Sequence, residues 1–197
     1  MKIYDISQEV FSCSVYPGDP KPEKQLLSAT AAGDLYNLTA FSMCAHNGTH
    51  IDAPKHFIKD GLAINDIPLE ATVGYCYVAR FDGVITRDAA LGILHEAQIS
   101  HPEAAKRLLI AGDAELSLEA AELLAEKGIL LFGNESQTVG NQDSPMAVHK
   151  ALLGKNVVLL EGIRLNGVEQ GVYILNAAPL NLAGSDGAPA RAILIKP

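Results

Sequence analysis

The chain has 197 residues, a length that suits one domain with a substantial hydrophobic core. Its composition, 48% hydrophobic and 19% charged residues, is typical of a globular protein, and its formal net charge is -8 at pH 7. The 15 lysines and arginines are scattered rather than clustered, which argues against nucleic acid and anionic membranes as partners.

The N-terminal segment MKIYDISQEV lacks the apolar run of a signal peptide, and no stretch of the chain approaches the ~20 apolar residues of a membrane span. We therefore expect a soluble cytoplasmic protein. No repeat, low-complexity tract or change of composition marks a linker, which predicts a single domain over residues 1–197. The three cysteines, Cys13, Cys44 and Cys76, form no C-x-x-C pair, so we expect small buried side chains rather than a disulfide framework.

Strand candidates recur along the chain as short runs rich in apolar, β-branched or aromatic residues. In the N-terminal half they are interrupted by turn-forming segments such as YPGDPKP, residues 16–22, and we expect that section to be partly antiparallel. The predicted strands cover residues 2–7, 35–43, 75–81, 107–112, 129–132, 156–162 and 191–197.

The middle of the chain predicts a parallel βαβ unit. Residues 117–128 have the pattern of an amphipathic helix, with Ser117 as its N-cap and Gly128 as its end. The runs before and after this helix are continuously apolar, as expected for parallel strands that are covered on both faces. These features predict an α/β fold.

The segment HNGTHIDAPKHF, residues 46–57, holds three of the six histidines of the chain. Gly48 and Pro54 disfavour a helix there, since in a helix interior proline costs ~3 kcal/mol and glycine ~1 kcal/mol relative to alanine. In an extended chain alternate side chains share a face, so we expect four even-numbered polar residues to point the same way. These are His46, His50, Asp52 and His56.

Distance separates these residues into different roles. At ~3.3 Å per residue, the Cα atoms of His50 and Asp52 lie ~6.6 Å apart, which suits two ligands of one metal ion. His46 would stand ~13 Å from His50 in a regular strand, but the Asn-Gly step between them favours a turn that shortens the gap. His56 lies beyond the bend at the proline, where it can serve as a general acid or base beside the ion.

A catalytic ion needs more ligands, and two candidates lie far along the chain. His149 precedes a short helical stretch, and Glu161 ends an apolar strand, where a carboxylate is costly to bury unless it is paired or bound to metal. Ordinary alternatives stay open: loop polarity for the histidine segment, a salt bridge at the strand end for Glu161, and no special role for His149.

The segment HNGTHIDAPKHF resembles the H-x-G-T-H-x-D-x-P-x-H signature of the cyclase-like metal-dependent hydrolases, which include the bacterial kynurenine formamidases, also called arylformamidases. The resemblance extends over nearly the whole chain. It includes DIS and YPGDP near the start and LLEGIRLNGVEQGVYILNAAPLNLAGSDGAPARAILI near the end. The pair His149-x11-Glu161 resembles the second ligand pair of the family in type and spacing.

This resemblance implies a fold of the swivelling β/β/α type, in which a mixed β-sheet or barrel-like core is flanked by helices. It also implies two divalent ions per subunit, zinc or in some relatives manganese, which hold a hydroxide that attacks the substrate carbonyl. A small-molecule amide is the implied partner, and a homodimer or larger homo-oligomer the implied assembly, with loops of a neighbour near the site. The implied site residues are His46, His50 and Asp52 on one ion, His149 on the second, Asp52 and Glu161 bridging both, and His56 as proton shuttle.

Three functions agree with these residues. The first is hydrolysis of the carbon–nitrogen bond of an aryl formamide such as N-formylkynurenine, to kynurenine and formate, in tryptophan breakdown. The second places a cyclic amide or lactone in the same site, as the isatin hydrolases of the family suggest. The third is a metal-binding protein without turnover. His56 beside the ligands favours an enzyme, since a structural metal site has no use for an acid or base.

Four further residues bear on the substrate. Tyr16 stands where the kynurenine formamidases commonly have tryptophan, and it can still stack on an aryl ring as a substrate-binding residue. Glu135 replaces an expected aspartate, in a loop that we expect to shape the pocket. Arg191 either neutralises a substrate carboxylate or braces a turn. Cys44 is an alternative zinc ligand or nucleophile, although a buried packing cysteine is commoner.

Overall fold

The computed structural model describes residues 1–140 and 145–196, and Pro197 at the end of the last predicted strand lies outside this description. Strands and helices are interspersed along the chain. The strands are β1 (Lys2–Asp5), β2 (Glu23–Ser28), β3 (Leu38–Ser42), β4 (His50–Asp52), β5 (Val73–Arg80), β6 (Gly83–Ile85), β7 (Arg107–Ala111), β8 (Ala114–Leu116), β9 (Leu131–Asn134), β10 (Val158–Glu161), β11 (Gly171–Asn176), β12 (Gly187–Pro189) and β13 (Ile193–Lys196). The α-helices are α1 (Leu69–Thr72), α2 (Arg87–Ser100), α3 (Leu118–Glu126) and α4 (Pro145–Leu153), and short 3₁₀ turns cover Val10–Ser12, Thr30–Ala32, Pro54–His56, Ile64–Asp66 and Ala104–Lys106.

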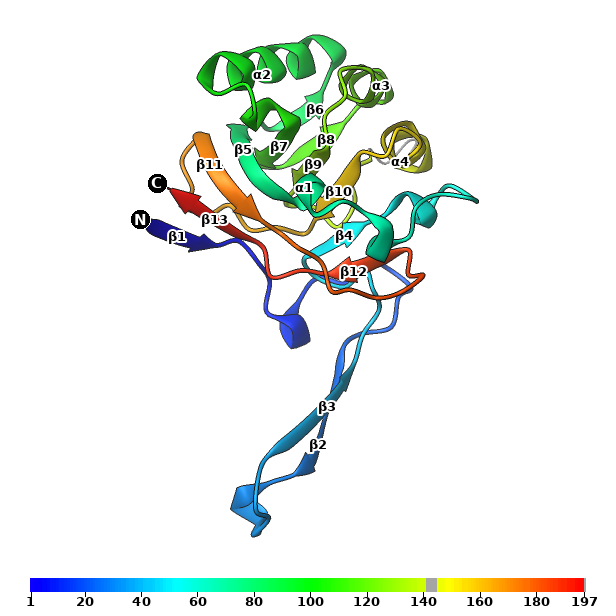
Figure 1. The fold of residues 1–197 in the computed structure, drawn as a ribbon, viewed down its shortest axis with the longest axis vertical. Helices are drawn as coiled ribbons and strands as arrows, with labels where there is room; N and C mark the ends of the chain where they lie inside the picture. Colours follow the sequence, from blue (N-terminus) through cyan, green and yellow to red (C-terminus); the bar gives the residue numbers. More distant parts are fainter. Residues whose placement is uncertain (141–144, 197) are drawn as a thin grey trace.

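A curled nine-stranded sheet forms the centre of the molecule, in the order β1-β13-β11-β5-β7-β9-β10-β4-β12 (Figure 1). Its four middle strands, β5, β7, β9 and β10, run parallel. On either side of them the pairing becomes antiparallel, from β11 outward at one end and from β4 outward at the other. The predicted α/β fold with a mixed, barrel-like sheet is confirmed.

Helices α2, α3 and α4 lie side by side over one face of the parallel strands (Figure 1). In β7, Leu108 and Ile110 pack into the core beneath these helices, while Leu109 and Ala111 pack into a second core inside the curl of the sheet. Because successive side chains of a strand alternate between its faces, a strand covered on both sides must be apolar throughout. This alternation explains the uninterrupted apolar runs in the sequence.

The predicted βαβ unit is confirmed as β7, α3 and the parallel strand β9. The hydroxyl of Ser117 accepts a hydrogen bond from the backbone N–H of Ala120 at 3.2 Å, which caps the helix. Gly128 follows the helix with φ of 72°, a left-handed conformation that favours glycine. Among the described residues, no helix combines the length and the apolar character that crossing a membrane requires.

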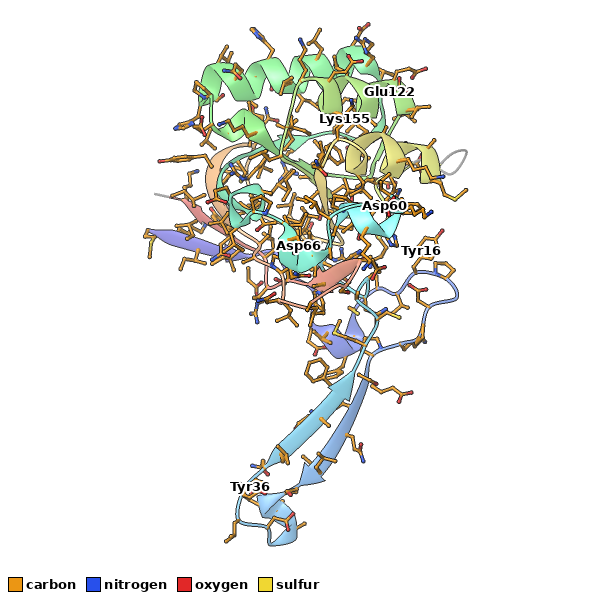
Figure 2. The ribbon with its side chains drawn as sticks, turned by 45° about the vertical axis from the view of Figure 1, so that its right-hand side comes forward. Tyr16, Tyr36, Asp60, Asp66, Glu122 and Lys155 are labelled. Atoms are coloured by element: carbon orange, nitrogen blue, oxygen red, sulfur yellow. The ribbon has the colours of Figure 1, made fainter. Side chains whose placement is uncertain are left out.

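The hairpin of β2 and β3 leaves the body as an extended arm, with Tyr36 near its far end (Figures 1 and 2). The prediction of one strand over residues 35–43 is correct only for its second part, and β2 is missing from the predicted set. The physical reason is that the residues of this hairpin are mostly exposed, so its sequence has no buried face to create an alternating pattern.

The register between β4 and β10 decides which side chains meet at the edge of the parallel strands. His50 lies opposite Glu161, and Ile51 lies opposite Leu160. Ile51 and Leu160 are buried in the core inside the curl. Alternation then turns His50 and Asp52 to the other face, where α4 covers the sheet.

Candidate metal centre

His46 lies in a tight turn immediately before β4. The side-chain oxygen of Asn47 accepts a hydrogen bond from the backbone N–H of Cys44 at 2.8 Å, and the backbone N–H of Asn47 donates to the carbonyl of Cys44 at 3.3 Å. Gly48 has φ of 64°, which glycine adopts readily. The predicted Asn-Gly turn is confirmed, and it leaves the rings of His46 and His50 only 5.1 Å apart at their centroids.

Two carboxylates lie between the pair of His46 and His50 on one side and His149 on the other. Asp52 Oδ1 is 2.8 Å from His46 Nδ1 and 3.2 Å from His50 Nε2, whereas Asp52 Oδ2 is 3.8 Å from His149 Nε2. Glu161 Oε2 is 3.5 Å from His50 Nε2, and Glu161 Oε1 is 3.1 Å from His149 Nε2. Each carboxylate therefore turns one oxygen towards the pair of His46 and His50 and its other oxygen towards His149. The structure thus brings together five of the residues that the sequence singles out.

The donor atoms gather into groups that could hold a metal ion. The ligand atoms of His46, His50 and Asp52 lie within 4.8 Å of one another, and so do those of Asp52, His149 and Glu161. Asp52 and Glu161 are 1% and 2% exposed. Buried carboxylates require positive charge nearby, and mixed imidazole and carboxylate ligands suit zinc and manganese.

The pKa shifts of the metal-free site also favour a bound cation. Burial lowers the pKa of His50, but the hydrogen bonds and charges of Asp52 and Glu161 outweigh burial and raise this pKa to about 10. Burial likewise lowers the pKa of His46, and its bonds to Asp52 and Asp186 raise it overall. Burial raises the pKa of Asp52, and its histidine neighbours bring that pKa well below its usual range. The carboxylates therefore hold protons on the rings that an incoming cation must displace.

His56 lies beside these ligand candidates. It is the last residue of the 3₁₀ turn that begins at Pro54. Its ring stacks on that of His46, with centroids 4.1 Å apart. His56 Nε2 is 4.0 Å from Asp52 Oδ2, farther than the closest histidine contacts of that carboxylate. The ring is 28% exposed, so it borders both the buried centre and the solvent.

Asp186 is a member of the site that the sequence reading missed. Its Oδ2 lies 2.9 Å from His46 Nε2 and 3.2 Å from His56 Nδ1. The residue belongs to the segment GSDGAPARA, whose likeness to the family ending was visible in the sequence. Nothing local to that segment indicates that it returns 140 residues along the chain to His46, because only the pairing of β12 with β4 brings it there.

A pocket of about 510 Å³ opens over the centre. Tyr16, labelled in Figure 2, is one of the residues that line it and is 47% exposed. Phe57 and Met146 contribute apolar surface to the same pocket. Cys44 also lines it, but burial raises the pKa of this thiol above its ordinary value, which disfavours the thiolate that a nucleophile or zinc ligand needs.

Comparison with known proteins places the chain in a family. Residues 4–140 match the family model described as "Putative cyclase". The chain belongs to this cyclase family. A kynurenine formamidase of Erythrobacter litoralis is 32% identical over 207 residues, which cover 98% of this chain and 93% of the relative.

Solved structures of the cyclase family share the fold. A "potential metal-dependent hydrolase with cyclase activity" superposes with a TM-score of 0.81 at 28% identity, covering 100% of this chain and 99% of that one. Isatin hydrolase A from Labrenzia aggregata superposes with a TM-score of 0.83 at 23% identity, covering 100% and 94%. The latter likeness concerns the fold alone.

Two residues that the sequence associates with the substrate lie elsewhere in this cyclase-family fold. Arg191 donates from Nε to a carboxylate oxygen of Asp5 at 3.0 Å and does not line the pocket over the centre, so it braces a turn. The carboxylate of Glu135 accepts hydrogen bonds from the backbone N–H groups of Gly112 and Leu165, each at 2.8 Å. The loop of Glu135 does reach the pocket, but through residues 137 and 138.

The close packing of Gly187 against His46 generates a first prediction. A Cβ atom at Gly187 would lie 2.6 Å from Cε1 of His46 and 2.8 Å from the carbonyl oxygen of Ile51, so Gly187→Ala must displace the ring or the strand. We expect its zinc affinity, measured by titration of the metal-stripped protein, to fall about 10-fold or more. Gly92→Ala in α2, where a Cβ atom meets nothing within 4 Å, is the control. Equal affinities of the two variants would contradict the assignment of His46.

The raised pKa of His50 generates a second prediction. The folded, metal-free chain holds this proton more tightly than the unfolded chain, whose pKa is near 6.5, so the proton stabilises the fold fully below about pH 6.5 and this stabilisation is lost as the pH rises towards 10. A cation held by Asp52 and Glu161 would replace the positive charge of this proton. We therefore expect the Tm of chelator-treated protein to fall more steeply from about pH 7 to 10 than the Tm of metal-loaded protein. Equal slopes in a thermal-shift series would refute this.

Proposed function

We propose that this chain is a metal-dependent hydrolase of a carbon–nitrogen amide bond, acting on an aryl formamide such as N-formylkynurenine. The observation that carries this proposal is the pair of buried carboxylates, Asp52 and Glu161. Each has one oxygen towards the His46 and His50 side of the site and the other towards His149. His46, His50 and Asp52 would hold one divalent ion, His149 the second, and Asp52 and Glu161 would bridge both. Zinc and manganese both suit these donors.

The ions supply the chemistry that the side chains lack. When bound, a pair of divalent ions activates water near neutral pH and stabilises negative charge on a carbonyl oxygen. The chain itself must hold the ligands at a fixed separation. The register of β4 on β10 places Asp52 and Glu161 on neighbouring strands, and the backbone N–H of Val139 orients Glu161 by donating to its Oε1 at 2.9 Å.

His56 is the group that moves protons in this proposal. An amine is a poor leaving group until its nitrogen is protonated. The Nε2 atom of His56 faces the centre next to Asp52, so it can take a proton released by the attacking water and deliver it to the departing nitrogen. Water and amide thereby become a carboxylic acid and an amine. A purely structural metal site would gain nothing from an imidazole placed this way.

The pocket supports an aromatic substrate. Tyr16 and Phe57 offer ring faces, and Met146 adds a flexible apolar contact. The relatives named kynurenine formamidase match this chain over nearly its whole length, which supports an aryl formamide. A cyclic amide or lactone is the second candidate, because it presents the same carbonyl to the same centre, and the isatin hydrolases share the fold.

Metal-loaded protein assayed against N-formylkynurenine, isatin and simple lactones tests the function and the role of His56 together. We expect hydrolysis of the formamide, and a loss of about 10²- to 10⁴-fold in kcat for His56→Ala at unchanged metal content. His95→Ala, on the exposed side of α2, is the matched control and should keep wild-type turnover. Full metal occupancy without hydrolysis of any of these compounds would favour a metal-binding protein, and wild-type turnover by His56→Ala would exclude its role.

We further propose that a second copy of the chain covers the β2–β3 arm. A two-stranded hairpin alone is marginally stable in water, and this one projects from the body (Figures 1 and 2). At its base lies a hollow of about 590 Å³, lined in part by Phe11, Phe41 and Met43. The exposed apolar side chains along the arm are Leu26, Leu27, Leu35, Tyr36, Leu38 and Phe41.

Two-fold symmetry makes these two features complementary. When two arms lie antiparallel about a two-fold axis, the tip of each arm reaches the base of the other, so the same contact forms twice. Leu35 and Tyr36 at the tip are 96% and 59% exposed, and the hollow at the base offers aromatic surface to receive them. A second copy is therefore the occupant that the arm fits best.

Light scattering after size exclusion tests this assembly. We expect a mass of at least twice the 20.9 kDa of one chain, and a shift towards the monomer for Leu35→Glu, because a charge at the tip cannot enter an apolar hollow. Ile99→Glu, also an apolar residue and 71% exposed but on α2 at the opposite end of the molecule, should leave the mass unchanged. A monomeric wild-type protein would end the proposal.

A further inference from the structure

One carboxylate oxygen contacts two imidazole rings at the mouth of the site. Asp186 Oδ2 is 2.9 Å from His46 Nε2 and 3.2 Å from His56 Nδ1. The two rings are stacked, with centroids 4.1 Å apart and planes inclined by 29°. Their facing nitrogens therefore converge on the same acceptor. A carboxylate oxygen has two lone pairs, so it can accept an N–H from each ring.

This arrangement fixes which nitrogen of each ring carries a proton. An ionised carboxylate only accepts hydrogen bonds, so both nitrogens that contact Asp186 must bear hydrogen. In His46 the other nitrogen, Nδ1, lies 2.8 Å from Asp52 and also bears hydrogen in the metal-free site; it is the nitrogen from which a bound cation would displace the proton. In His56 this arrangement leaves Nε2, the atom that faces Asp52 Oδ2, as the nitrogen able to accept a proton. One carboxylate thus keeps hydrogen on His46 Nε2 and His56 Nδ1, which leaves the opposite nitrogen of each ring for a cation or a proton.

Asp186 is itself held firmly by backbone contacts. Its carbonyl accepts a hydrogen bond from the backbone N–H of Ala53 at 2.9 Å, directly after β4. On either side of it, the carbonyl of Ser185 accepts from the backbone N–H of Ile64 at 2.9 Å, and the hydroxyl of Ser185 donates to the carbonyl of Gly187 at 2.8 Å. The carboxylate is therefore presented from a fixed backbone, although it is 46% exposed itself.

We propose that Asp186 is a positioning residue that locks the tautomer and the ring orientation of both His46 and His56, coupling a metal ligand to the proton shuttle. The inference rests on the proposed function for the roles of the two histidines. A ring flip of His56 would exchange Nδ1 for a carbon atom and break its contact with Asp186, so the carboxylate also opposes flipping. Asp186→Asn weakens this selection with least change of shape. It removes the negative charge, its amide oxygen accepts hydrogen bonds more weakly than a carboxylate, and its amide nitrogen, when turned inward, donates to a ring nitrogen that lacks hydrogen.

Three measurements on Asp186→Asn test the inference. Nitrogen-15 NMR of the metal-free protein should show His56 mainly protonated at Nδ1 in the wild type and a mixture of tautomers in the variant. Zinc affinity, measured by competition with a chromophoric chelator, should fall 10- to 100-fold. At saturating metal, kcat should fall 10- to 100-fold with KM changed by less than about 3-fold, because substrate contacts are unaltered. Asp60→Asn, an exposed carboxylate elsewhere on the surface (Figure 2), is the matched control and should match the wild type.

The first two measurements need no substrate, so they decide the role of Asp186 even where no amide is hydrolysed. Wild-type tautomers and wild-type zinc affinity in Asp186→Asn overturn the inference, whether or not the variant is less stable. The ligand atoms of Asp186, His46 and His56 also lie close enough to hold a cation directly. A stoichiometry that falls from three zinc ions per chain to two in the variant would therefore overturn the inference in favour of a ligand role.

Discussion

The cost of burying two carboxylates governs the architecture around this site. Asp52 and Glu161 are almost fully buried on neighbouring strands, and ionised carboxylates at such depth destabilise the fold unless cations or hydrogen-bond donors meet them. The donors come from every side: the rings of His46, His50 and His149, and the backbone N–H of Val139. Apolar side chains of similar volume would often stabilise the fold as well or better, which is why a cluster of this kind indicates chemistry rather than structure.

The sheet satisfies this constraint through its register. Ile51 and Leu160 pair across β4 and β10 and are drawn into the core inside the curl, so His50 and Glu161 must face the opposite side together. A shift of one residue would send the ligands into the apolar core, and the burial of Ile51 therefore protects the geometry of the centre. Glu161 is also the last residue of the parallel strand β10, and α/β sheets commonly bind ligands outside the carboxyl ends of their strands.

Features that depend on interactions between nearby residues could be predicted from the sequence, whereas features that depend on the pairing of distant strands could not. The turn at Gly48, the cap at Ser117 and the apolar parallel strands each follow from interactions within a few residues, and each prediction is confirmed. Asp186 was missed because its role depends on β12 lying beside β4, which no local pattern encodes. The arm was half missed because an exposed hairpin shows no buried face. The metal, the assembly and the cytoplasmic location stay predictions, since sequence and fold constrain them only loosely.

Side-chain exposure increases from Asp52 through His56 to Asp186, and this order agrees with the roles proposed for these residues. Asp52 is 1% exposed, the ring of His56 28% and the carboxylate of Asp186 46%. A group that holds a cation gains from low dielectric, because its attraction to the ion is least screened there. A group that moves protons must instead return to its starting state after each turnover, which requires contact with solvent. His56 lies between these two environments, stacked on the partly buried ring of His46 and bonded to an exposed carboxylate. In the proposed mechanism, the same surface would thus provide both the metal ligands and a proton relay in contact with solvent.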